Sequence, residues 1–86
     1  MYNETQLNNI ESMTFWAMEF ATDRETWAAL CKRARNNNQA KDKAIKDAEA
    51  RAALSAKFAI NYCKDAGLEP ETVLSVAVNF RKMVSA

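Results

Sequence analysis

The sequence predicts an all-α fold, a small compact bundle of about four helices in a single domain over residues 1–86. Gly67 is the only glycine and Pro70 the only proline, so turn-forming residues are almost absent. Apolar residues recur instead every three or four positions, which is the period of an amphipathic helix. With 49% hydrophobic and 27% charged residues, the composition is that of a globular domain rather than a disordered one.

We expect the first helix over residues 4–21, with Asn3 as its N-cap. The second helix is expected over residues 23–35, and its start rests on the Thr-Asp-Arg-Glu sequence at 22–25. In a capping box, the Thr22 hydroxyl would accept a hydrogen bond from the backbone amide of Glu25, and the Glu25 carboxylate would accept one from Thr22. This pattern predicts a helix start directly after the first helix ends.

The third helix is expected over residues 39–66, after a hairpin tip at the three asparagines 36–38. The alternative is one continuous helix over residues 23–66. Gly67 suits a left-handed residue just beyond a helix end, and Pro70 suits the first position of a fourth helix over 70–85. The third helix has a heptad seam of mostly small residues, which favours close helix packing: Ile45, Ala48, Ala52, Ser55, Ala59, Tyr62 and Ala66. The fourth has an apolar stripe that we assign to the core: Val73, Val76, Ala77, Phe80, Met83 and Val84.

The residue inventory argues against enzyme chemistry, so we expect no catalytic residues, no cofactor and no metal site. There is no histidine, which removes the commonest general base and a leading metal ligand. Cys31 and Cys63 are too far apart for a C-x-x-C pair, and we expect free buried thiols rather than a disulfide. The polar start lacks a signal-peptide pattern and no apolar run reaches membrane-spanning length, so we expect a cytoplasmic protein without membrane contact.

The first helix carries more apolar surface than one buried face requires. Met13, Trp16 and Ala17 share one side of it, whereas Phe15 and Met18 lie nearly opposite. Either other helices cover the second stripe, or a partner does, a second copy or a foreign protein. The third helix offers a possible matching surface. The protein-interface candidates are Leu7, Glu11, Phe15, Met18, Leu54 and Phe58.

Charge is unevenly distributed along the chain, although the net charge is only +1. Residues 1–31 carry a net charge of −4, whereas residues 32–46 carry +5 and bracket the expected hairpin tip. Clustered cations are typical of phosphate-binding surfaces, although a solvated surface partly neutralised by Asp42, or contact with an acidic protein, would also explain them. The basic-patch candidates are Lys32, Arg33, Arg35, Lys41, Lys43 and Lys46.

These observations together favour a small non-enzymatic protein-binding module. We expect a regulator or inhibitor that docks on a larger macromolecular complex, of the kind that phages and mobile elements encode. The expected partner is another protein or protein complex, and a homodimer is compatible with the same apolar excess. The alternative is a nucleic-acid-binding helical protein that uses the basic segment 32–46.

Overall fold

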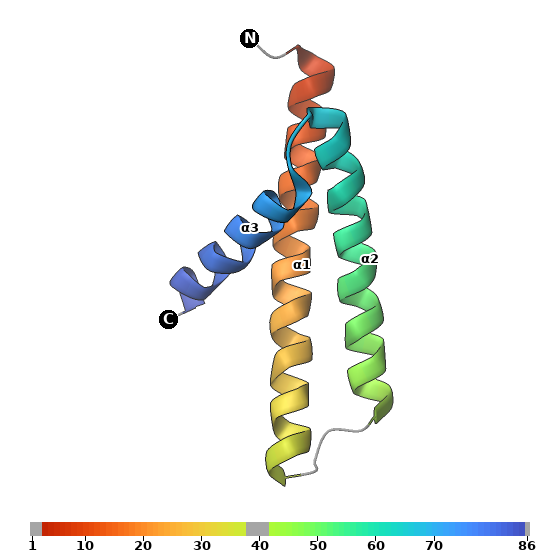
Figure 1. Cartoon of the computed structure of the whole chain (residues 1–86), viewed down its shortest axis with the longest axis vertical. Coiled ribbons are helices and arrows are strands. Elements are labelled where there is room, and N and C mark those ends of the chain that lie inside the picture. Colours follow the sequence, from red (N-terminus) through yellow and green to blue (C-terminus); the bar gives the residue numbers. More distant parts are fainter. Residues whose placement is uncertain (1–2, 38–41, 86) are drawn as a thin grey trace.

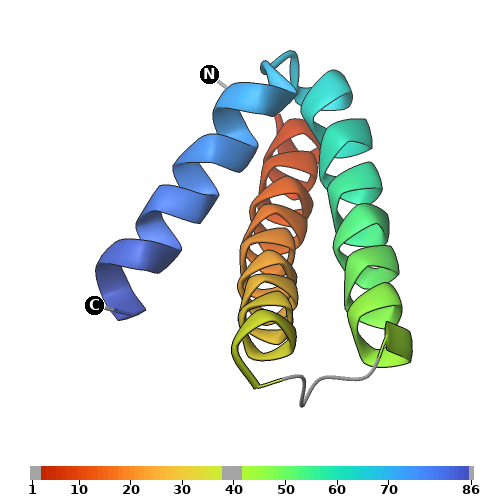
Figure 2. The ribbon, with the colours of Figure 1, turned by 60° about the horizontal axis from the view of Figure 1, so that its bottom comes forward.

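The computed structural model describes residues 3–37 and 42–85, and within them the chain forms three helices and no strand. They are α1 (Glu4–Asn37), α2 (Asp42–Ala66) and α3 (Pro70–Ser85). α1 and α2 form a long antiparallel hairpin, while α3 crosses α1 and diverges from it toward the C-terminus (Figures 1 and 2). The molecule is elongated, at 52 × 26 × 16 Å. The all-α prediction is confirmed, but the predicted count of four helices is wrong.

The error lies at Thr22, where α1 continues instead of ending. The Thr22 hydroxyl donates a hydrogen bond to the Met18 carbonyl 3.1 Å away, one turn earlier in the same helix. The Glu25 carboxylate accepts a hydrogen bond from Arg81 of α3 instead of capping a helix start. Ala21 and Asp23 are both buried, and a continuous helix keeps both of them against its neighbours. The predicted helices 4–21 and 23–35 are therefore one helix.

The predicted hairpin is confirmed, although its position in the sequence differs from the prediction. α1 continues to Asn37, so residues 36 and 37 of the expected tip at 36–38 belong to the helix. α2 begins at Asp42 rather than at residue 39, and residues 38–41 lie outside the described part of the chain. Because α1 and α2 run antiparallel side by side (Figure 1), the alternative of one helix over 23–66 is wrong.

Three helix boundaries predicted from local sequence signals are confirmed: the start of α1, the end of α2 and the start of α3. Asn3 caps α1, because its side-chain oxygen accepts a hydrogen bond from the Gln6 backbone amide and the Gln6 side chain accepts one from the Asn3 amide. Gly67 has φ of 74°, the left-handed conformation that glycine adopts without a Cβ penalty. The Leu68 amide then donates to the Cys63 carbonyl at 2.9 Å, which completes a Schellman motif at the end of α2.

The core where the three helices meet consists of alanine. Ala17 and Ala21 of α1, Ala59 of α2 and Ala77 of α3 form one buried cluster, and Ala59 has no exposed surface. Side chains this small let helix backbones approach closely, as the seam of small residues in the third predicted helix indicated. They also enclose little volume, so few large apolar side chains are buried.

A buried polar contact joins α1 to α2 within this seam. Asp23 and Ser55 are only 8% and 4% exposed. The Ser55 hydroxyl donates to Asp23 Oδ2 at 2.7 Å, and Arg51 Nε donates to Asp23 Oδ1 at 3.2 Å. A buried carboxylate is tolerated only when such donors satisfy it. The contact therefore favours one register of α2 along α1.

Replacing Ala59 with leucine should destabilise the fold because the larger side chain has no space between the helices. We expect the free energy of unfolding to fall by about 1–3 kcal/mol, the usual cost of overpacking a core. Ala53→Leu is the matched control, since Ala53 is exposed on the same helix, and it should change stability by less than about 0.5 kcal/mol. Urea unfolding followed by circular dichroism measures both. Equal effects of the two substitutions would contradict the close packing at Ala59.

Candidate protein-interaction surface

One side of α3 is left uncovered by the rest of the chain. Val76, Phe80, Met83 and Val84, here called the α3 stripe, are 61%, 51%, 76% and 60% exposed. Their assignment to the core was therefore wrong. Ala77 is buried and Val73 packs against the alanine cluster, as expected. The α3 stripe is exposed because α3 diverges from α1. The first turns of α3 lie against α1, and its C-terminal turns lie farther from it (Figure 1).

An apolar groove of about 470 Å³ lies between α1 and the α3 stripe. We call it the outer groove, and none of its lining residues is charged. Met18 contributes one wall from α1, and Val76 and Phe80 contribute the other from α3. The full lining is Met13, Thr14, Ala17, Met18, Thr72, Val73, Val76, Ala77 and Phe80.

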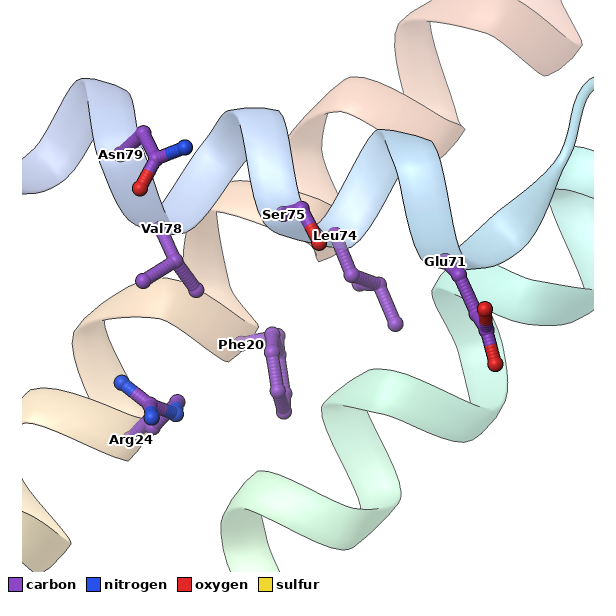
Figure 3. Close-up of a pocket in the computed structure, with 7 residues that line it drawn as sticks. All are labelled: Phe20, Arg24, Glu71, Leu74, Ser75, Val78 and Asn79. Atoms are coloured by element: carbon purple, nitrogen blue, oxygen red, sulfur yellow. The ribbon is translucent and has the colours of Figure 1, made fainter.

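A second groove between α1 and α3 has a mixed lining. In Figure 3, Phe20 of α1 and Leu74 of α3 point into the same space, with Arg24 near one end and Glu71 near the other. Ser75, Val78 and Asn79 complete its lining. Its charged residues all lie at an open surface, so it lacks the enclosed polar anchors of a small-molecule site.

An aromatic cluster spans α1 and α2. The rings of Phe15 and Trp16 meet edge to face with their centroids 5.1 Å apart. The ring centroids of Trp16 and of Phe58 in α2 are 4.7 Å apart. Phe15 is 57% exposed and Phe58 37%. Leu54, one turn before Phe58, is 52% exposed. We call this surface the aromatic face, defined by Phe15, Trp16, Leu54 and Phe58.

The six predicted interface residues do not form a single patch. Phe15 and Phe58 come together through Trp16, and Leu54 lies beside Phe58 on α2. Leu7 and Glu11 are exposed two turns and one turn before Phe15 on α1. Met18 instead packs against the alanine cluster and lines the outer groove. The sequence analysis missed Val76 and Phe80 as surface candidates, because their spacing is that of any buried helix stripe.

Carboxylates flank the most exposed ring of the aromatic face. Glu11 and Glu19 lie four residues before and four residues after Phe15, on adjacent turns of the same side of α1. Neither Glu11 nor Glu19 forms an ion pair with any residue that the structure describes. The ion pairs of the described residues use other carboxylates. These pairs are Asp23–Arg51 and Glu25–Arg81. On its α1 side the aromatic face therefore has an acidic margin, Glu11 and Glu19, whereas its α2 side has the cations Arg51 and Lys57, each three residues from Leu54.

The basic segment gathers at the opposite end of the hairpin from the α1 N-terminus. The end of α1 and the start of α2 lie next to each other there (Figure 1). Both contribute exposed cations, namely Lys32, Arg33, Arg35, Lys43 and Lys46. Lys41, the sixth basic-patch candidate, lies outside the described residues. We call this surface the basic end.

The remaining groups of chemical interest in residues 3–37 and 42–85 are the metal-ligand residue types and the two thiols. This part of the chain contains no cluster of three histidine, cysteine or carboxylate residues placed to hold a metal ion. Cys31 and Cys63 are free thiols, and Cys63 is fully buried. Burial raises the pKa of the Cys63 thiol, and the negative charge of Glu69 raises it further. Among the helices described, none has the length and apolar character needed to cross a bilayer.

No protein-family model, no curated protein and no solved structure matches the chain. The aromatic face, the outer groove and the basic end are the features of the chain from which a function can be inferred.

The two thiols should react at different rates with a thiol reagent. Cys31 is partly exposed, whereas Cys63 is enclosed and its raised pKa leaves little reactive thiolate. We expect Cys63 to react at least ~10-fold more slowly in the folded protein, and at a similar rate in denaturant. Stopped labelling followed by mass spectrometry gives both rates, with Cys31→Ser to assign them. Equally fast labelling of both thiols in the folded protein would contradict the burial of Cys63.

Proposed function

We propose that this chain is a non-enzymatic protein-binding module that docks through its aromatic face on a larger protein or complex. On this proposal it acts as a regulator or inhibitor by covering the surface that it binds. The observation that carries the proposal is Phe15, a large aromatic side chain more than half exposed on a long helix. Exposed aromatic residues are favoured in interfaces, and a few of them often carry most of the binding energy.

The aromatic face is suited to binding because its rings are held before a partner arrives. Phe15 rests edge-on against Trp16, and Trp16 in turn contacts Phe58 across the hairpin. Ordering flexible side chains opposes association, so rings that are already held lose less conformational entropy on binding. Because α1 and α2 are packed together, the two sides of the face keep a constant separation. This support favours a partner with a shallow apolar depression.

The acidic margin specifies the chemistry of the partner further. Glu11 and Glu19 sit on either side of Phe15 and have no cation neutralising them within the described residues. Charge complementarity across an interface speeds association and excludes unsuitable partners. The matching surface would have lysine or arginine side chains around an apolar centre. Phosphate groups would be repelled here, so the aromatic face favours protein over nucleic acid.

Phe15→Ala should weaken partner binding by about 2 kcal/mol or more, a ~30-fold increase in Kd, since it removes the central ring. The partner is first recovered from a nuclease-treated host lysate with the tagged chain, then purified and titrated by calorimetry. Because Phe15 is exposed, the free energy of unfolding should fall by less than about 1.5 kcal/mol. Unchanged affinity would remove the aromatic face as the binding site, and an unfolded variant would mean that Phe15 is a core residue.

A charge reversal with a matched control separates local from global electrostatics. Glu11→Lys should slow association with the same partner, because it places a cation beside Phe15. Glu49→Lys changes the net charge equally at an exposed position of α2 outside the aromatic face. It should leave the association rate nearly unchanged. Equal effects of the two variants would argue against the acidic margin as part of the interface.

The alternative function, nucleic-acid binding, is favoured by the basic end. Cations from the end of α1 and the start of α2 gather there, at one end of a molecule 52 Å long. Phosphate contacts are additive and depend strongly on salt, so a cluster matters more than the net charge of the whole chain. This surface lies away from the aromatic face, and the two functions can therefore be tested separately.

If the basic end binds nucleic acid, the double variant Lys32→Ala, Arg33→Ala should bind a short duplex or single strand more weakly. The slope of log affinity against log salt should become shallower by about 0.7–0.9 for each phosphate that the variant no longer neutralises. Fluorescence anisotropy over a salt series measures both quantities. Phe15→Ala serves as the control and should have no effect. Absence of salt-dependent binding by the unmodified chain would exclude this function.

A further inference from the structure

We infer that two copies of this chain associate about a two-fold axis, with the α3 stripe of each copy packed against the outer groove of the other. This inference is independent of the proposed function, because it involves α3 and the outer groove rather than the aromatic face. It concerns the part of the fold that the monomer leaves without a partner.

The monomer exposes more surface than a protein of its mass usually does. A compact monomer of 9.7 kDa has about 5,100 Å² of accessible surface, whereas this chain has 6370 Å². The excess of about 1,250 Å² is larger than the ~800 Å² that each partner buries in a standard interface. The radius of gyration of 14.8 Å similarly exceeds the value of about 12 Å expected for 86 residues. The excess surface of the whole chain is therefore large enough to include a dimer contact of standard size.

Much of the uncovered apolar surface is on α3. All four residues of the α3 stripe are more than half exposed, on a helix of 16 residues. α3 is attached to the hairpin through Ala77, through Val73, Leu74 and Val78, which pack against the alanine cluster, and through the Arg81–Glu25 ion pair at 2.9 Å. Contact with a second copy would cover the stripe and hold α3 against the hairpin.

The distribution of charge on α3 points to a second copy as the occupant. At about 100° per residue, its charged residues Glu71, Arg81 and Lys82 occupy one sector of the helix. The α3 stripe occupies the nearly opposite sector, and no lining residue of the outer groove is charged. In a two-fold interface, both copies contribute the same surface patch. A charge-free surface can be paired in this way without placing like charges opposite each other.

The shape of this surface is also self-complementary. Val76 and Phe80 belong to the α3 stripe and at the same time form one wall of the outer groove, so ridge and groove lie side by side. In a two-fold pair, the ridge of each copy can enter the groove of the other. The aromatic face differs in having charged residues, Glu11 and Glu19 among them, beside its rings. The two apolar surfaces therefore call for different partners.

Sedimentation equilibrium of the full chain over a micromolar concentration series tests the inference. We expect a species of twice the 9.7 kDa chain mass. Phe80→Glu and Met83→Glu should each abolish it, because two carboxylates would be buried near the axis. Met83 is 76% exposed, so its substitution disturbs the monomer least and decides the test if Phe80→Glu fails to fold. Phe15→Ala is the control and should remain dimeric. A monomer at every concentration, or a dimer that survives Met83→Glu, would overturn the inference.

Cysteine cross-linking then tests the location. Val76→Cys, in a Cys31→Ser background, places a thiol in the inferred interface. Ser75→Cys places one at the neighbouring exposed position that lines the other groove. With a short bismaleimide, we expect Val76→Cys to yield at least ~10-fold more cross-linked dimer, because the reagent joins only two thiols that lie within the length of its spacer. Equal yields from the two variants would place the contact elsewhere and overturn the inference.

Discussion

The contact of the three helices through alanine is the constraint on which the rest of the structure depends. Ala17, Ala21, Ala59 and Ala77 bring the helices together with almost no side-chain volume between them. Buried apolar area is the main source of stability, and a core this small provides little of it. Large side chains do not fit into such a seam. Phe15, Leu54 and the α3 stripe lie outside this seam and remain exposed at the surface.

The buried carboxylate of Asp23 helps to fix the register between α1 and α2, whose contact surface is formed mostly by small side chains. Alanine faces are nearly uniform, so packing alone discriminates poorly between registers of α1 and α2. The donors Ser55 and Arg51 are available to Asp23 in one register, and a shifted register would leave the carboxylate buried without them. The same register places Trp16 beside Phe58 and so assembles the aromatic face. A polar contact in the core thus positions the proposed binding surface.

Charge separates the two apolar surfaces into different chemical classes. The aromatic face has carboxylates on either side of Phe15, which suits a partner with a basic margin. The α3 stripe and the outer groove have no charge, which permits self-association. The basic end is separated from both along the hairpin (Figure 1). The proposed dimer contact, the proposed docking face and the basic end are therefore separate surfaces of one small chain.

The helical class and most helix ends could be predicted from the sequence, because they follow from local backbone rules. Asn3 and Gln6 satisfy the first amides of α1, and Gly67 with Pro70 separates α2 from α3, in each case through contacts within a few residues. The small-residue seam of α2 could likewise be predicted from the sequence, since it depends only on the spacing of residues within one helix. It identified Ser55 and Ala59, both buried.

The continuity of α1 at Thr22 and the coverage of the apolar stripes depend instead on tertiary packing. The capping-box residues fit a helix start equally well, but Glu25 pairs with α3 while Ala21 and Asp23 are buried on either side of Thr22. Periodicity identified the stripes of Phe15 and Phe80 without showing what lies against them. Coverage depends on how two helices cross, and α3 diverges from α1 beyond the alanine contact. That crossing leaves the α3 stripe exposed, a property that no single helix encodes.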